Sequence, residues 1–106
     1  MPENAGGFPE VDRLIHEPAR LALLTVLSAC ESADFTFLQR VTGLSKGNLS
    51  VQLTKLEQAG LVYIEKTIYQ KKTLTTAELS RQGRDQLSEY WRVMRRIQEQ
   101  SAPRPE

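Results

Sequence analysis

The stretch of residues 37–62, FLQRVTGLSKGNLSVQLTKLEQAGLV, constrains the fold most, because a glycine separates two apolar patterns of helical period. Gly43 interrupts the first pattern in the way that a turn needs. Ser45 stands where a serine can cap the free backbone amides of a helix, which we expect over residues 46–59. Leucines recur there at i, i+4 and i+7, and Gly60 follows as a left-handed C-cap residue does. The stretch therefore predicts a helix, a tight turn and a second helix.

Two helices joined by a short glycine-containing turn are typical of the helix-turn-helix, whose second helix enters the DNA major groove. The charge distribution favours this interpretation. Residues 36–72 carry six basic and two acidic side chains, whereas residues 1–35 carry two basic and six acidic ones, so the net charge of +1 hides a basic centre. A single lysine usually lies on a solvated face. The clustering of basic side chains in the half of the chain that is predicted to read DNA indicates instead a patch that faces phosphates.

Two more helices are expected outside this centre. A proline at its first position places one helix over residues 18–29, and Asp34 or Thr36 is the candidate cap of the next. A last helix is expected over residues 80–99, with Ser80 as its N-cap and with apolar side chains every three or four residues. Gly83 within it indicates either a close approach of another backbone or a frayed first turn.

Between the helix at residues 46–59 and the last helix, two runs of β-prone residues, 62–67 and 73–79, predict a hairpin, which we call the wing. Its DNA-facing part is expected over residues 66–75. The connection has no Asn-Gly or Asp-Gly pair, which favours a long, mobile loop over a tight turn. The predicted fold is therefore α+β and mostly helical: a winged helix-turn-helix with a two-stranded β-hairpin wing and a C-terminal dimerisation helix.

One domain is expected over residues 11–97, between polar, Pro-containing tails at 1–10 and 98–106 that we expect to be flexible. No apolar run approaches the roughly 20 residues of a membrane helix, and no charged-then-apolar leader is present, so we expect a cytoplasmic protein without a membrane partner. The sequence shows no Gly-rich phosphate loop and no catalytic triad. We therefore expect neither an enzyme nor a cofactor.

The side of helix 46–59 opposite its leucines carries residues suited to a DNA groove. These are Gly47, Ser50, Val51, Thr54 and Gln58, with Asn48 and Lys55 on the flanks, and Lys46 lies at the start of the helix. Asn48 can pair with adenine N6 and N7, and Val51 can pack on a thymine methyl group. The lysines suit phosphates, which position a protein without reading sequence. Periodicity alone fits an ordinary amphipathic helix, but the scarcity of acidic residues here and the basic wing favour DNA.

The order of elements, with SKGNLSVQLTKLEQAGLVYIEK followed by YQKKTLTTAELSRQGRDQL, resembles winged-helix transcriptional regulators related to the MarR and ArsR families. The resemblance covers roughly residues 14–97. It implies that helix 46–59 is the recognition helix, that Gln52 also faces DNA, and that Lys71 and Lys72 act from the wing. The complete set of expected DNA-binding residues is Ser45, Lys46, Gly47, Asn48, Ser50, Val51, Gln52, Thr54, Lys55, Lys71 and Lys72.

The resemblance also implies a two-fold homodimer built from the terminal helices. The expected interface residues are Leu14, Leu21, Leu87, Tyr90, Trp91, Met94 and Ile97. Such a dimer would bind a near-palindromic double-stranded operator, as a repressor, with half-sites about 34 to 36 Å apart. A small-molecule effector, if one exists, would lodge at the dimer interface between the first and last helices, in a groove lined by Leu14, Leu21, Tyr90, Trp91 and Met94, although such residues more often form plain core or interface.

The chain departs from the metal-sensing ArsR pattern, which needs clustered Cys or His ligands, because it contains only Cys30 and His16. These two cannot complete a four-ligand zinc site in one chain, so no metal is expected. We expect Cys30 to be buried and inert. The main alternative function is a winged-helix protein–protein interaction module without specific DNA binding, since a fold does not settle function.

Overall fold

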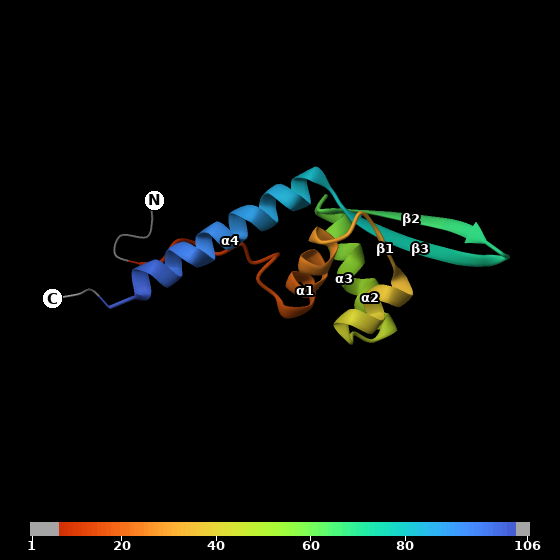
Figure 1. Cartoon of the computed structure of the whole chain (residues 1–106), viewed down its shortest axis with the longest axis horizontal. Coiled ribbons are helices and arrows are strands. Elements are labelled where there is room, and N and C mark those ends of the chain that lie inside the picture. The colour runs from red at the N-terminus through yellow and green to blue at the C-terminus, as the bar shows by residue number, and fades with distance from the viewer. Residues whose placement is uncertain (1–6, 104–106) are drawn as a thin grey trace.

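The computed structural model of the protein describes residues 7–103, so positions 1–6 and 104–106 of the predicted tails lie outside it. The elements in chain order are α1 (Pro18–Ser28), β1 (Ala33–Asp34), α2 (Phe35–Thr42), α3 (Lys46–Gln58), β2 (Val62–Tyr69), β3 (Lys72–Leu79) and α4 (Arg81–Ser101). The first three helices form a central body, from which the wing and α4 project in opposite directions (Figure 1). The result is elongated, with extents of 66 × 27 × 23 Å. This architecture confirms the predicted winged helix-turn-helix.

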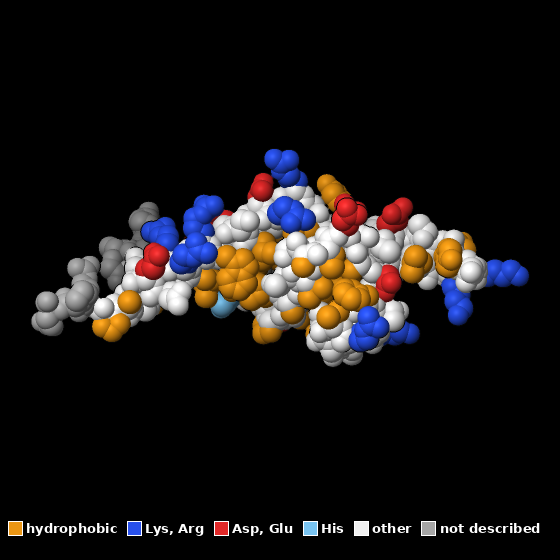
Figure 2. All heavy atoms as spheres, viewed as in Figure 1, with side chains coloured by type: hydrophobic (Ala, Val, Ile, Leu, Met, Phe, Trp, Pro, Cys, Tyr) orange, Lys and Arg blue, Asp and Glu red, His pale blue; other side chains and the backbone are white. Residues whose placement is uncertain are grey.

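Charged side chains are distributed along the whole length of this shape (Figure 2). Figure 2 shows basic side chains over α4 and at the free end of the wing, with hydrophobic side chains between them over the helical body. No helix within residues 7–103 is both long and apolar enough to cross a membrane.

The sheet has three antiparallel strands in the order β1-β3-β2. Strand β1 was not predicted, because two residues are too few to show an alternating pattern; it pairs Ala33 with Ala77 and Asp34 with Thr76. The wing strands pair without interruption from Val62↔Leu79 to Tyr69↔Lys72. The short third strand ties the base of the wing to the start of α2.

The turn of the wing corrects one prediction. Because Tyr69 pairs with Lys72, only Gln70 and Lys71 connect the strands, so the predicted long loop is wrong. Both residues have positive φ, of 50° and 66°, as a two-residue turn that matches the twist of a hairpin requires. A left-handed conformation costs a non-glycine residue about 1–2 kcal/mol. The continuous strand pairing offsets this cost, although the turn lacks the usual Asn-Gly.

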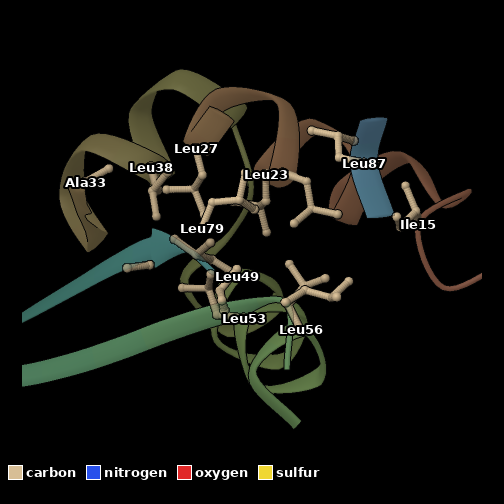
Figure 3. Packing of buried hydrophobic residues seen from close by; sticks show 14 of the residues in the cluster. Ile15, Leu23, Leu27, Ala33, Leu38, Leu49, Leu53, Leu56, Leu79 and Leu87 are labelled. Carbon is tan, nitrogen blue, oxygen red and sulfur yellow. The ribbon is translucent and has the colours of Figure 1, made fainter. Parts of the chain in front are cut away.

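The core lies where α1 faces α3 over the base of the wing. Leu23 and Leu27 of α1 point toward Leu49 and Leu56 of α3 (Figure 3), and all four are fully buried. Leu79, at the base of the wing, joins the same cluster. The predicted leucine stripe of α3 is therefore confirmed as its core-facing side, which leaves the opposite side of the helix free.

Side-chain caps set the helix starts that flank the turn. Asp34 Oδ1 accepts a hydrogen bond from the Phe37 amide at 2.7 Å, so Asp34, of the two candidates, caps α2. Ser45 Oγ accepts one from the Asn48 amide at 3.1 Å, which confirms the predicted cap of α3. Gly43, between these helices, has a φ of 74°, a conformation that glycine adopts without strain.

The first turn of α4 is clamped onto the junction between α3 and β2. Ser80 Oγ caps Gly83 N at 2.9 Å and donates to Gly60 O at 2.6 Å. A Cβ atom added at Gly83 would lie 2.1 Å from Leu61 O. Of the two interpretations of Gly83, close approach of another backbone is therefore correct. The far end of α4 reaches Ser101, so residues 98–101, expected in the tail, are helical.

Candidate nucleic-acid interface

The outer face of α3 is open to solvent along its whole length. Every predicted DNA-binding residue of this helix and its cap is exposed except Gln52: Ser45, Lys46, Gly47, Asn48, Ser50, Val51, Thr54 and Lys55. Val51 is half exposed, so its side chain is free to contact another molecule. A Cβ atom added at Gly47 would meet no atom within 4 Å. The open space at Gly47 lets another molecule approach the helix backbone closely.

The inner face of the wing continues this surface. Side chains alternate across a strand, so Lys66, two residues after Ile64, lies on the same side of the sheet. Lys66 pairs with Thr75, next to the pair of Ile64 with Ala77, and Ala77 is only 2% exposed. The side of the wing that is buried at its base therefore becomes exposed toward the tip, where Lys66 is followed by Ile68, which is 80% exposed.

Two shallow hollows join α3 to this surface. One of about 370 Å³ is lined by Phe35, Lys46, Gly47, Ser50 and Thr75. The other, of about 210 Å³, includes Thr54 and Lys66 together with Ser50 and Thr75. Because Ser50 and Thr75 line both hollows, α3 and the wing form one continuous concave surface.

Lys66 and Thr75 belong to this surface but were missing from the predicted side-chain set, although residues 66–75 were expected to face DNA. The alternation of Val62, Ile64 and Lys66 carried the signal, since the first two pack inward. The opposite face of the wing carries Glu65 and Glu78. The wing is thus basic on the side of α3 and acidic on the other side near its base.

The structure places Gln52 in the interior, not on the DNA-facing side. Its side chain is only 9% exposed. Gln52 Oε1 accepts a hydrogen bond from Arg20 Nη1 at 2.9 Å, and Gln52 Nε2 donates to Asn48 Oδ1 at 3.0 Å. Gln52 lies at the edge of the leucine stripe, and Arg20 of α1 covers it. It therefore contacts the predicted reading residue instead of solvent.

The residues predicted for a dimer interface divide into two groups. Leu87 and Tyr90 are 5% and 3% exposed and belong to the core of this single chain, so they offer a partner little area. Tyr90 OH also hydrogen-bonds to His16 Nδ1 at 2.8 Å. Trp91 is 43% exposed. The remaining four, Leu14, Leu21, Met94 and Ile97, are partly buried.

The groove expected for an effector differs from the hollow that the structure contains. A hollow of about 500 Å³ lies between residues 10–13 and α4 and is lined by Val11, Gln86, Tyr90 and Val93 among others. Tyr90 alone of the predicted groove residues lines it.

Cys30, expected to be buried, is partly exposed, because it follows the end of α1. Within residues 7–103, no three His, Cys, Asp or Glu side chains cluster closely enough to hold a metal ion.

Comparison with known proteins supports the interpretation of this surface. The family model described as "Winged helix DNA-binding domain" matches residues 19–98. The uncharacterized protein MJ0432 of Methanocaldococcus jannaschii is 27% identical over 78 residues, which cover 74% of this chain and 85% of that protein. A transcriptional regulator homologue from Pyrococcus horikoshii OT3 has a TM-score of 0.78 and 25% identity, with 83% of this chain and 87% of that chain covered.

Two further solved structures share the fold at lower identity. A MarR-family regulator from Silicibacter pomeroyi has a TM-score of 0.64 and 22% identity, covering 88% of this chain and 63% of that chain. The transcriptional repressor CouR, bound to a 23-mer DNA duplex, has a TM-score of 0.69 and 20% identity, covering 83% and 62%. Because the family model spans both the recognition helix and the wing, the chain belongs to the winged helix DNA-binding domain family.

Proposed function

We propose that the protein is a homodimeric, sequence-specific transcriptional repressor that binds double-stranded DNA through α3 and the wing. The observation that carries this proposal is the continuous concave surface of α3 and the inner wing face. Its basic side chains are Lys46, Lys55 and Lys66. Lys71 lies in the turn at the tip, and Lys72, which pairs with Tyr69, lies at the tip on the other face of the wing. Glu57, at the edge of the smaller hollow, is the acidic residue on the concave surface.

The dimensions fit a duplex. A helix of 13 residues such as α3 is about 20 Å long at 1.5 Å per residue, and the major groove is about 12 Å wide, so one α-helix fits into it. In this arrangement the exposed polar side chains of the first turns of α3 reach base edges. The wing lies beside the helix, and its lysines reach the neighbouring phosphate backbone or the minor groove.

The dimer is proposed from the shape of α4. The helix extends beyond the central body (Figure 1), and Trp91 stands exposed on it next to the partly buried Met94 and Ile97. A second copy packed against these residues would bury them and place two recognition helices on one face. The repressor role draws on the fold similarity to CouR, which is described as a repressor and was solved on a duplex.

Selection from a random duplex pool, followed by fluorescence anisotropy at two salt concentrations and light scattering, tests the proposal. We expect enrichment of a near-palindromic site bound by two chains, with affinity that falls steeply as salt rises. Pool selection without any enriched sequence would refute specific binding. A monomer at concentrations that saturate the selected site would refute the dimer.

One observation favours the alternative of a protein-interaction module. The wing exposes large apolar side chains on both faces. Ile68, at 80%, lies on the α3 side, and three others are Tyr63 at 63%, Tyr69 at 64% and Leu74 at 38%. The strand pairing places these three on the face of the wing away from α3. In the alternative function this face binds a protein partner, and α3 and the inner face of the wing bind no specific DNA sequence. The same selection decides between the two functions, because the interaction module predicts no enriched sequence.

A further inference from the structure

A chain of side-chain hydrogen bonds runs from α1 through the interior to the exposed end of α3. Arg20 Nη1 donates to Gln52 Oε1 at 2.9 Å, and Gln52 Nε2 donates to Asn48 Oδ1 at 3.0 Å. Arg20 is itself held, because its Nε donates to Leu14 O at 2.6 Å and its side chain is only 12% exposed. Asn48, the last member, is exposed. The chain therefore connects a fixed interior charge to a residue at the surface.

The chemistry of the groups determines the direction of every bond in this chain. A guanidinium group has only donors, so the Gln52 atom that faces Arg20 must be the carbonyl oxygen. The amide NH₂ group of Gln52 then points the other way, toward Asn48. An NH₂ group also only donates, so the Asn48 atom that meets it must be Oδ1. Reversing either amide would bring two donors together at Gln52, whose side chain is only 9% exposed.

We propose that Arg20 and Gln52 are positioning residues that orient the Asn48 amide so that α3 presents its NH₂ group to DNA. This inference rests on the proposed function. The Nδ2 group faces outward as a donor, and one lone pair of Oδ1 is already used. A donor suits the acceptors on guanine, thymine and the N7 of adenine, whereas the major-groove edge of cytosine offers only a donor. Asn48 therefore selects against cytosine at the base that it contacts.

The substitution Gln52→Glu tests the direction of the chain. A carboxylate still accepts from Arg20 but cannot donate to Asn48, so the Asn48 amide turns, donates inward and presents Oδ1 to DNA. The preference at that base then shifts toward cytosine N4 or adenine N6. We expect a change of about tenfold in relative affinity, since one good base contact discriminates by about 1–3 kcal/mol.

Gln58→Glu is the matched control. Gln58 is exposed on the same helix, so this variant adds the same charge without entering the hydrogen-bond chain. Position-by-position selection on randomised duplexes should give weaker binding with unchanged base preference for Gln58→Glu, and an inverted preference at one base per half-site for Gln52→Glu. If Gln58→Glu shifts the same base, charge and not amide orientation is responsible, and the inference is overturned.

A second measurement needs neither DNA nor a variant. In side-chain amide NMR spectra of the wild-type protein, the Gln52 NH₂ group should exchange slowly with water and the Asn48 NH₂ group quickly. The opposite pattern overturns the inference even if Gln52→Glu fails to fold. A wild-type protein that selects no sequence overturns the proposed function and this inference with it. A selective wild type whose preference survives Gln52→Glu overturns the inference alone.

Discussion

Replacing Gly83 with alanine should destabilise the fold, although alanine is the better helix former. The new Cβ atom would lie 2.1 Å from Leu61 O and 2.9 Å from Leu79 Cδ1, so the start of α4 must move away from the α3–β2 junction. That movement breaks two hydrogen bonds of Ser80, from Oγ to Gly60 O at 2.6 Å and from the amide to Leu61 O at 2.9 Å. The contact is with backbone, which cannot move aside as a flexible side chain can.

The opposing contributions can be compared. The two hydrogen bonds are worth about 1 kcal/mol each, overpacking costs about 1–3 kcal/mol, and the helix propensity of alanine returns about 1 kcal/mol. We expect the free energy of unfolding to fall by roughly 2–4 kcal/mol and the melting temperature by roughly 10 °C or more. Urea and thermal unfolding followed by circular dichroism, at one fixed protein concentration, measure both.

Gly47→Ala provides the control with the opposite sign. Gly47 is also helical, but an added Cβ atom there meets nothing within 4 Å, so this variant should gain about 0.4–1 kcal/mol of stability. It should at the same time weaken DNA binding if the open space at Gly47 admits the duplex. If Gly83→Ala is as stable as the wild type, the close approach of the two backbones does not constrain α4, and the reasoning fails.

Three further predictions concern the proposed interface. The double variant Lys71→Ala/Lys72→Ala should bind all DNA more weakly and make the salt dependence shallower, by about 0.9 per lysine lost in the log–log slope for each subunit; an unchanged slope would exclude the wing tip from the phosphates. Lys66→Ala should weaken binding measured by anisotropy, whereas Glu65→Ala, one residue away on the other face of the wing, should not; equal effects would contradict a DNA-facing inner side. Trp91→Ala should shift the dimer–monomer equilibrium toward monomer in light scattering, and, because Trp91 is the only tryptophan, wild-type emission should shift to shorter wavelength as concentration rises.

The sequence determined those features that neighbouring residues decide among themselves. Ser45 and Ser80 could be identified as helix caps because a cap acts on amides within three residues of it. The exposed face of α3 could be predicted because an α-helix has 3.6 residues per turn. The spacing of the leucines therefore identifies the buried side, and the exposed face is the side opposite to it. The inward position of Lys66 was also implicit in the alternation of the strand.

Only the tertiary structure decided the features that depend on distant parts of the chain. The two-residue turn at Gln70 and Lys71 exists because strand pairing offsets its strained backbone, and β1 becomes a strand only by pairing with β3. The position of Gln52 depends on Arg20, which lies 32 residues earlier in the chain. The family resemblance implied that Gln52 faces DNA, whereas its hydrogen bond to a guanidinium group from another helix holds it in the interior. A buried donor must find its acceptor wherever the fold brings one, and a local pattern does not contain that information.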